Sequence, residues 1–138
     1  HISEFPAGTY KKAHRHGPGA HVIILSGRGY SLMWLEGQPR IKIDWHKGSM
    51  IVPPGGWFHQ HFNLGTEPAR YCALRWEGRK HRMGRPAGVD VSIELGGSQI
   101  EYEDEDPLIH RSFEAAMVKA GAICQMGSYH PFCTRKGD

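Results

Sequence analysis

The sequence predicts an all-β fold, an antiparallel barrel or sandwich of short strands, followed by one C-terminal α-helix. From Thr9 to Trp76, Gly and Pro interrupt short β-type runs, and no apolar stripe with a helical period is long enough for a helix. The predicted strands cover residues 9–16, 21–26, 29–35, 40–45, 49–53, 57–63 and 69–76. Short strands at this spacing are typical of a small antiparallel sandwich or barrel.

Two charge runs follow the predicted strands. Residues 79–85 are basic and residues 101–106 are acidic, with an alternating, strand-like segment at 89–95 between them. Runs of this length are usually solvated faces, and 17 Lys and Arg against 14 Asp and Glu is no large basic excess. We therefore expect no nucleic-acid partner.

One amphipathic helix is predicted at about 107–120. Asp106 followed by Pro107 is typical of an N-cap and a first helical residue, and apolar residues recur at helical spacing after them. The chain is accordingly divided into a barrel at residues 1–100 and a C-terminal part at residues 101–138. We expect the helix of this second part to pack on the barrel or on a partner subunit.

Composition excludes several classes of protein. The chain has 138 residues, enough for one domain, and its longest apolar run is strand-sized, far below the roughly 18 residues of a membrane span. Its 3 cysteines are far apart without a C-x-x-C pair, which indicates neither a disulfide framework nor a thiolate zinc site. Reduced thiols and no visible secretory signal lead us to expect a cytoplasmic protein, and the start at His1 rather than Met suggests a longer parent chain.

Five of the 10 histidines form two tight groups. His14 and His16 are two residues apart, which in a β-strand places both side chains on one face. His59 and His61 repeat this spacing in a second predicted strand, and His21 follows a Gly-Pro-Gly turn. Neutral imidazoles from different strands suit Fe, Zn, Cu and Ni. The arrangement therefore predicts a transition-metal site.

Two motifs around these histidines resemble the two motifs of the cupin family. The first is Gly8-x5-His14-x-His16-x4-His21, and the second is Gly48-x5-Pro54-x-Gly56-x2-His59-x3-Asn63. They span residues 8–29 and 48–63, and a spacer of two predicted strands separates them, as in cupins. The resemblance implies a cupin-type antiparallel β-barrel, a double-stranded β-helix or jelly roll, with a metal ion held in its mouth.

The resemblance implies that His14, His16 and His59 are metal ligands. No carboxylate stands where cupins usually have a fourth ligand, a glutamate. One alignment of the first motif puts His21 at that position and gives a four-histidine site, whereas another puts Ala20 there and leaves three histidines. We favour His21, because the Gly-Pro-Gly turn can absorb one residue of slip.

Strand parity suggests further site residues. Tyr10 and Lys12 would share the face of the first histidine pair, so Tyr10 is a candidate proton donor and Lys12 a candidate carboxylate binder. His61 would face the same interior, either as a hydrogen-bonding partner of the site or as a candidate acid–base group. Arg75 is a second candidate carboxylate binder if the odd-numbered residues of the last strand point inward.

A site with only histidine ligands leaves the bound ion with its full positive charge, which favours an anionic or enolate-forming substrate. By the resemblance, cupins with three or four histidines are often non-haem Fe(II) dioxygenases, and this is the predicted activity. The alternatives are a lyase or isomerase that uses Zn, Ni or Mn as a Lewis acid, and a non-catalytic ligand-sensing module of a larger protein. The expected partners are a small-molecule substrate and, as in many cupins, a second copy of the chain in a homodimer.

Overall fold

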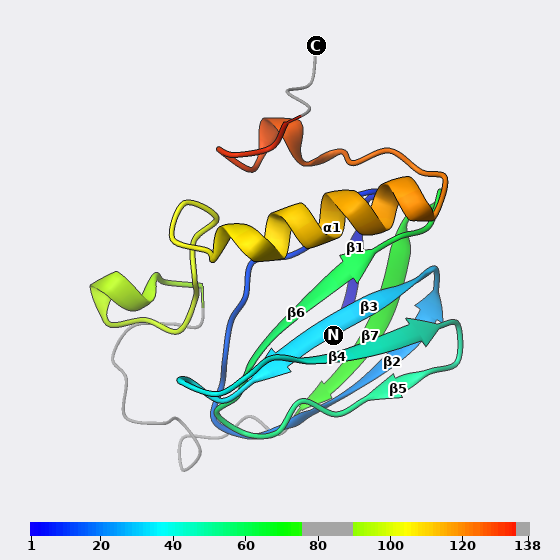
Figure 1. The fold of residues 1–138 in the computed structure, drawn as a ribbon. Coiled ribbons are helices and arrows are strands. Elements are labelled where there is room, and N and C mark those ends of the chain that lie inside the picture. The colour runs from blue at the N-terminus through cyan, green and yellow to red at the C-terminus, as the bar shows by residue number, and fades with distance from the viewer. Residues whose placement is uncertain (76–89, 135–138) are drawn as a thin grey trace.

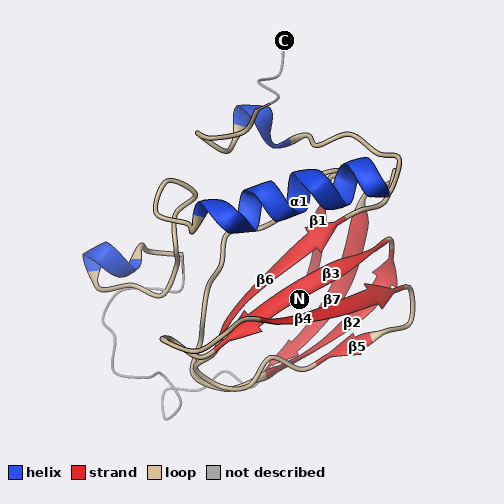
Figure 2. Cartoon of the chain, viewed as in Figure 1, coloured by secondary structure: helices blue, strands red, loops and turns tan. Residues whose placement is uncertain are grey.

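The computed structural model describes residues 1–75 and 90–134, which form two facing antiparallel sheets with a helix on the outside (Figure 1; Figure 2). The first sheet contains, in spatial order, β1 (Ile2–Phe5), β7 (Ala69–Arg75), β2 (Ala20–Ser26) and β5 (Met50–Ile51). The second contains β4 (Ile41–His46), β3 (Arg28–Trp34) and β6 (Phe58–Asn63). The helices are α1 (Pro107–Lys119) and the short 3₁₀ turns η2 (Ile93–Leu95) and η3 (Met126–Ser128). The predicted all-β sandwich with a C-terminal helix is confirmed.

The core between the sheets follows from alternation along the strands. In β2 the buried residues are Ala20, Val22 and Ile24, and β7 buries every second residue in the same way. Gly27 links β2 to β3 with a φ of 90°, a left-handed backbone that favours glycine. Strand β6 differs, because all 6 of its residues are buried. One face of β6 belongs to the core between the sheets, so the other must be covered from outside.

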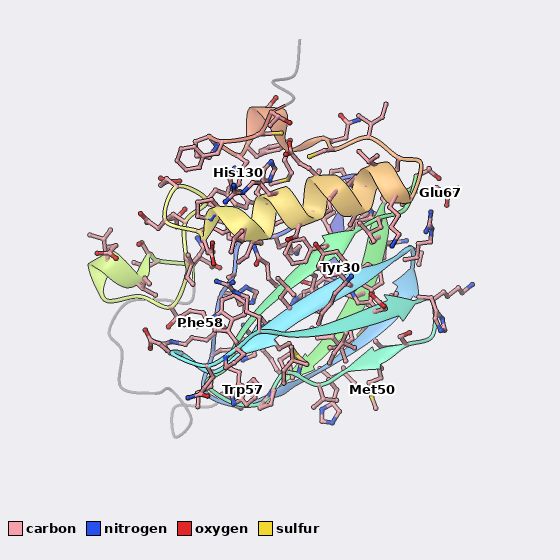
Figure 3. All side chains as sticks on the ribbon, viewed as in Figure 1. Tyr30, Met50, Trp57, Phe58, Glu67 and His130 are labelled. Carbon is pink, nitrogen blue, oxygen red and sulfur yellow. The ribbon has the colours of Figure 1, made fainter. Side chains whose placement is uncertain are left out.

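Helix α1 covers the outer face of the second sheet (Figure 1). Ile109, Phe113 and Met117 form a buried stripe along the helix, and this stripe packs with Tyr30 of β3 and Phe62 of β6. Figure 3 shows Tyr30 on the side of β3 that faces α1. The outer face of β6 is therefore sealed by the helix.

The boundaries of α1 match the prediction closely. Oδ1 of Asp106 accepts a hydrogen bond from the Leu108 amide, and Pro107 is the first helical residue. The helix ends at Lys119, one residue before the predicted end. At 13 residues it is too short to cross a membrane, and no other helix of the described chain is long and apolar enough to do so.

Some elements differ from the prediction. The strand expected at 89–95 is wrong for its described part, where Ser92 makes an isolated bridge to Gln99 and η2 follows. The Ser92 side chain accepts from the Glu94 amide, and this local bond stabilises a turn in place of a strand. Strand β1 was not predicted, and it adds an edge to β7. The basic loop at 79–85 lies outside the described residues.

The acidic run at 101–106 is not simply a solvated face. Glu101 pairs with Lys12, and Oδ2 of Asp106 lies 2.9 Å from Nη1 of Arg40. Glu105 is only 5% exposed and accepts hydrogen bonds inside the molecule. A buried carboxyl group is stable only with such partners, so Glu105 belongs to the interior, whereas Glu103 and Asp104 are exposed.

The segment at 9–16 runs alongside β6 but is not a regular strand. Tyr10 and His14 form isolated bridges, to Phe62 and His59 respectively. The bridges are four residues apart on this segment and three apart on β6, so one extra residue is accommodated between them, as in a β-bulge. An extra residue reverses which side chains face inward on its two sides. Tyr10 consequently faces α1, whereas His14 faces the interior between the sheets.

Replacing Phe113 by Ala tests the packing of α1 on the second sheet. Phe113 has 0% exposure, so we expect the free energy of unfolding to fall by about 3–5 kcal/mol. Val118→Ala, at a residue of the same helix that is 70% exposed, should change it by less than about 0.5 kcal/mol. Urea denaturation followed by circular dichroism measures both, and equal losses in the two variants would contradict the packing.

Candidate metal centre

Three histidines converge at one place in the space between the sheets. His14, His16 and His59 each offer a ring nitrogen, and these nitrogens lie within 4.8 Å of one another. The ring centroids of His14 and His59 are 4.4 Å apart, and those of His16 and His59 are 4.8 Å apart. Backbone hydrogen bonds of 3.2 and 2.9 Å in both directions join His14 to His59. The fold thus brings together the three ligands that the resemblance implies.

Backbone carbonyls orient all three rings in the same way. In each ring Nδ1 lies within hydrogen-bond distance of a carbonyl oxygen two residues away along the chain. The pairs are His14 with Lys12 at 3.3 Å, His16 with Pro18 at 2.7 Å and His59 with Trp57 at 3.1 Å. Because a carbonyl only accepts, each Nδ1 carries the proton and donates it. The lone pair of each Nε2 is therefore available to a metal ion.

Burial keeps the imidazoles of His14 and His59 neutral. It lowers the pKa of His14 to about 4, and the neighbouring His16 and Lys11 lower this pKa as well. Burial, reinforced by His14 and His61, holds the pKa of His59 well below its ordinary range. Metal ions bind the neutral form of histidine, so at neutral pH the rings of His14 and His59 need lose no proton before binding.

The first sheet presents Ala20, and not His21, to the interior. Ala20 is 2% exposed, whereas the His21 side chain is exposed on the outer face of β2. The burial of Val22 and Ile24 fixes this phase, because turning His21 inward would turn both of them outward. The structure therefore does not bring His21 to the cluster. It supports the alternative alignment, with three histidines and Ala20 at the position of the usual carboxylate.

A polar group lies beside the three histidines in the same interior. His61 faces inward as predicted and is 2% exposed. Trp45 Nε1 donates to Ser31 Oγ at 3.1 Å, and that hydroxyl lies 2.7 Å from Nδ1 of His61. The ring centroids of His61 and Tyr71 are 5.3 Å apart, and Lys11 Nζ donates to the Tyr71 hydroxyl at 3.1 Å. A cation, a phenol and an imidazole thus adjoin the candidate metal centre.

Tyr10 and Lys12 do not share the histidines' face. The Tyr10 hydroxyl donates to Oε1 of Glu105 at 2.7 Å on the side of α1, and Lys12 pairs with Glu101 outside the barrel. The cause is the extra residue between Tyr10 and His14, which reverses the inward positions. Lys11 takes the inward place, and strand parity missed it. In the sequence, the one hint was that Lys11 and Lys12 are adjacent, so that a shift of one residue exchanges which lysine faces inward.

Arg75 is on the inward face of β7. Tyr71 and Ala73 are buried, and alternation puts the half-buried Arg75 on their side of the strand. Arg75 pairs across the sheet with Ala20, the residue at the position of the usual carboxylate. Its part in substrate binding stays a prediction.

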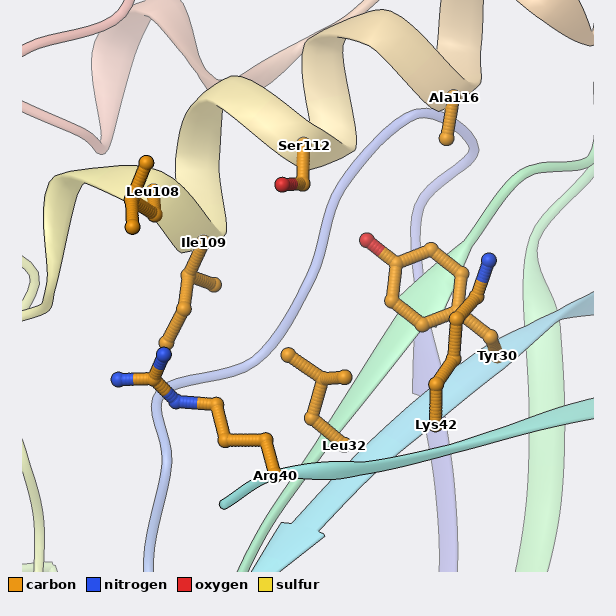
Figure 4. A pocket seen from close by; sticks show the side chains of 8 residues that line it. All are labelled: Tyr30, Leu32, Arg40, Lys42, Leu108, Ile109, Ser112 and Ala116. Carbon is orange, nitrogen blue, oxygen red and sulfur yellow. The ribbon is translucent and has the colours of Figure 1, made fainter.

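A separate cavity of about 220 Å³ lies between α1 and the second sheet (Figure 4). Tyr30 and Leu32 of β3 line it on one side, and Ile109 and Ser112 of α1 on the other. These strand residues alternate with Ser31, which contacts His61, so the cavity is on the opposite face of the sheet from the histidines. The residues that line it include no histidine, cysteine or carboxylate.

The burial of His61 predicts an acid-sensitive fold. Burial, with the nearby His14 and Lys11, lowers the pKa of His61 from 6.5 to about 3. Between these values the unfolded chain binds more protons than the folded chain, so the stability from this group is complete above pH 6.5 and is lost as the pH falls toward 3. In metal-free protein, His61→Gln should flatten this acid-side loss, and the exposed His46→Gln should not. Urea unfolding between about pH 7 and pH 4 measures the slopes; an unchanged slope in His61→Gln would contradict the assignment.

Comparison with known proteins adds to this geometry. No match was found among curated proteins. Among solved structures, the Drosophila melanogaster CENP-C cupin domain is similar with a TM-score of 0.51 and 12% identity, over 54% of this chain and 58% of that chain. CapF, a capsular polysaccharide assembling protein from Staphylococcus aureus, is similar with a TM-score of 0.50 and 18% identity, over 62% of this chain and 24% of that chain. A deletion mutant of Bacillus subtilis oxalate decarboxylase is similar with a TM-score of 0.50 and 16% identity, over 52% of this chain and 20% of that chain.

Each of these matches spans less than two thirds of the other chain, and at such identities the likeness is one of fold alone. The match to a family model is more specific. Residues 1–75, more than half of the chain, match the model described as a cupin domain. That match, together with the two facing sheets and the three converging histidines, shows that the chain belongs to the cupin family.

Proposed function

We propose that this cupin is a metal-dependent enzyme that acts on a small anionic or enolisable substrate, as a non-haem Fe(II) dioxygenase. The observation that supports this most is the neutral ligand set. His14, His16 and His59 converge, and Ala20 occupies the position where cupins usually have a carboxylate. None of these four side chains offsets the charge of a divalent ion. A substrate oxyanion would supply the missing negative charge, and so would bind directly at the centre.

Three protein ligands also suit catalysis better than a purely structural role. Structural metal sites commonly have four protein ligands, whereas catalytic sites keep a position open. His14 and His16 are only partly buried, which leaves the site accessible from solvent. Imidazole is a good ligand for ferrous iron, and when bound, the iron would supply the redox chemistry that activates oxygen.

The interior cation is suited to hold a substrate anion beside the histidines. Lys11 Nζ donates to the hydroxyl groups of Tyr71 and Ser3, which are neutral, and no ion pair of Lys11 occurs among residues 1–75 and 90–134. The charge of Lys11 is felt at His14 and His61, whose pKa values it lowers. A carboxylate or enolate in this space would gain a charge-assisted hydrogen bond from Lys11.

His61 has a different role in this proposal from that of a general base. An efficient base has a pKa near the working pH, and burial lowers the pKa of His61 to about 3. His61 therefore stays neutral at pH 7 and serves as a hydrogen-bonding group. Its ring orientation is fixed by Ser31 and Trp45, so it can position a substrate with little loss of side-chain entropy.

Metal analysis and oxygen uptake on the same preparation test the proposed reaction. Protein purified anaerobically is analysed by plasma mass spectrometry and then assayed with enolisable 1,3-diketones, hydroxylated aromatic acids and thiols in an oxygen electrode. Iron that supports substrate-dependent oxygen uptake is the expected result. Turnover with zinc, nickel or manganese under nitrogen would replace the proposal by a Lewis-acid lyase or isomerase. Substrate binding without turnover would indicate a ligand-sensing module.

Substitution of single histidines tests the ligand set. His14→Ala, His16→Ala and His59→Ala should each lose most of the iron that the parent protein binds after reconstitution, because two imidazoles hold the ion too weakly. His21→Ala should retain it, because His21 is exposed on the other face of β2. His46→Ala is a second control at an exposed histidine. Full iron retention in His59→Ala would refute the site.

The neighbouring lysines provide a matched test of the inward cation. Lys11→Met should raise KM for an anionic substrate about 10- to 100-fold, the equivalent of one lost hydrogen bond to a charged group of about 1.5–3 kcal/mol. Lys12→Met removes the same charge one residue away, on the outer side, and should leave KM within about twofold. Steady-state kinetics of both variants, with iron content as a check, measures the two KM values. A larger rise in KM for Lys12→Met than for Lys11→Met would contradict the inward placement of Lys11.

A further inference from the structure

A second cluster of metal-binding side chains lies between α1 and the segment that follows it. His110 and Glu114 are one turn apart on α1, and Cys124 and Cys133 come from the C-terminal segment, which runs back along the helix (Figure 1). One ligand atom from each of the four lies within 4.8 Å of all the others. His110, Cys124 and Cys133 are buried, and Glu114 is partly buried. This cluster is separate from the three histidines of the barrel and shares no residue with them.

The distances inside the cluster are those of a tetrahedral zinc site. With Zn–S bonds of about 2.3 Å and Zn–N or Zn–O bonds of about 2.0–2.1 Å, a tetrahedron has edges of about 3.8 Å for S···S, 3.5 Å for S···O and 3.4 Å for N···O. The two sulfur atoms, of Cys124 and Cys133, are 3.9 Å apart. Cys133 Sγ is 3.5 Å from Glu114 Oε1, and His110 Nε2 is 3.3 Å from the same oxygen. Three edges of the tetrahedron are therefore already in place.

The outer hydrogen bonds of His110 direct its second nitrogen toward the cluster. His110 Nδ1 lies 3.0 Å from the Tyr10 hydroxyl, which itself donates to Oε1 of Glu105 at 2.7 Å. Because the hydroxyl proton goes to the carboxylate, Nδ1 of His110 donates to the Tyr10 oxygen and Nε2 keeps its lone pair. Nε2 is buried and makes no hydrogen bond within the described residues, although Glu114 is near. A metal-binding histidine commonly has such an outer partner on its other nitrogen.

We propose that His110, Glu114, Cys124 and Cys133 bind one Zn²⁺ ion, which fastens the C-terminal segment to α1. Four protein ligands, two of them thiolates, are typical of a structural zinc site. The wide spacing of the cysteines had argued against thiolate zinc, but here a histidine and a glutamate one helical turn apart complete the set. Within residues 120–134 the only helix is the three-residue η3, so the ion would replace secondary structure as the source of order.

Cobalt spectroscopy distinguishes this site from the barrel histidines. The full chain, reduced and stripped of metal, is titrated with Co²⁺, and the spectrum is recorded. Cysteine thiolates bound to Co²⁺ give a ligand-to-metal charge-transfer band, whereas histidines give none. We expect this band in the parent protein and also in His14→Ala/His59→Ala, where it should reach its maximum at one bound equivalent because the barrel site has lost two of its three histidines. Because that variant lacks two of the three barrel histidines, a band in it reports thiolate binding whether or not the barrel site has the proposed function.

Substitutions of the cysteines and of Glu114 identify the ligands. Cys124→Ser/Cys133→Ser should lose the band, and Glu114→Gln should weaken Zn²⁺ binding measured by competition with a chromophoric chelator. Cys72→Ser is the matched control, because Cys72 lies on β7 away from the cluster, and it should bind as the parent does. Circular dichroism and the thermal midpoint verify that each variant is folded. Should Cys124→Ser/Cys133→Ser not fold, loss of the band in the parent protein after alkylation of its thiols gives the same information.

Two results would overturn the proposal. The first is a reduced parent protein that is saturated with Co²⁺ and shows no thiolate charge-transfer band. The second is a parent protein, purified without added oxidant, whose mass shows Cys124 and Cys133 joined by a disulfide even after incubation with Zn²⁺. In that case the two thiols would be a redox pair, and the neighbouring His110 and Glu114 would have no metal to bind.

Discussion

Strand β6 is buried on both faces, and this constraint governs the rest of the structure. Its inner face carries His59 and His61 into the space between the sheets, while Phe62 on its outer face supports α1. Buried polar side chains are costly unless they are hydrogen-bonded. The polar residues of β6 therefore have internal partners: the Trp57 carbonyl for His59, Ser31 for His61, Glu105 for Gln60, and the Pro6 and Glu67 carbonyls for Asn63. One strand thus contributes His59 to the candidate metal centre and receives the C-terminal part of the chain.

Glu105 is the polar link between the barrel and the C-terminal part. Its carboxyl oxygens lie 2.6 Å from Nε2 of Gln60, 2.7 Å from the Tyr10 hydroxyl and 3.3 Å from Nε2 of His130. Burial raises the pKa of Glu105, and the three contacts oppose this rise. His130 also stacks on His110 with ring centroids 4.0 Å apart, so side-chain contacts connect Glu105 to the cluster on α1. His130 is labelled beside α1 in Figure 3.

Local signals in the sequence were enough for much of this architecture, and non-local pairing decided the rest. Asp106 and Pro107 predicted the start of α1, and the His-x-His and Pro-x-Gly-x2-His patterns predicted the three converging histidines. Whether Ala20 or His21 faces inward depends on the phase of β2 against its neighbours, which its own residues do not reveal. The extra residue before His14 is likewise defined only by its pairing with β6. The cysteine cluster was missed because its ligands meet only after α1 has folded against the C-terminal segment.

The extra residue before His14 separates two properties that strand alternation would otherwise couple. Downstream of it, His14 keeps its pairing with His59, while upstream the inward position is held by Lys11. A relative with one residue fewer here would retain all three histidines and yet turn a different side chain toward the interior. In such a fold, the charge beside the three histidines can change by insertion or deletion, without any substitution of the histidines themselves. Alignments that count only identities at motif positions would classify the two proteins as equivalent.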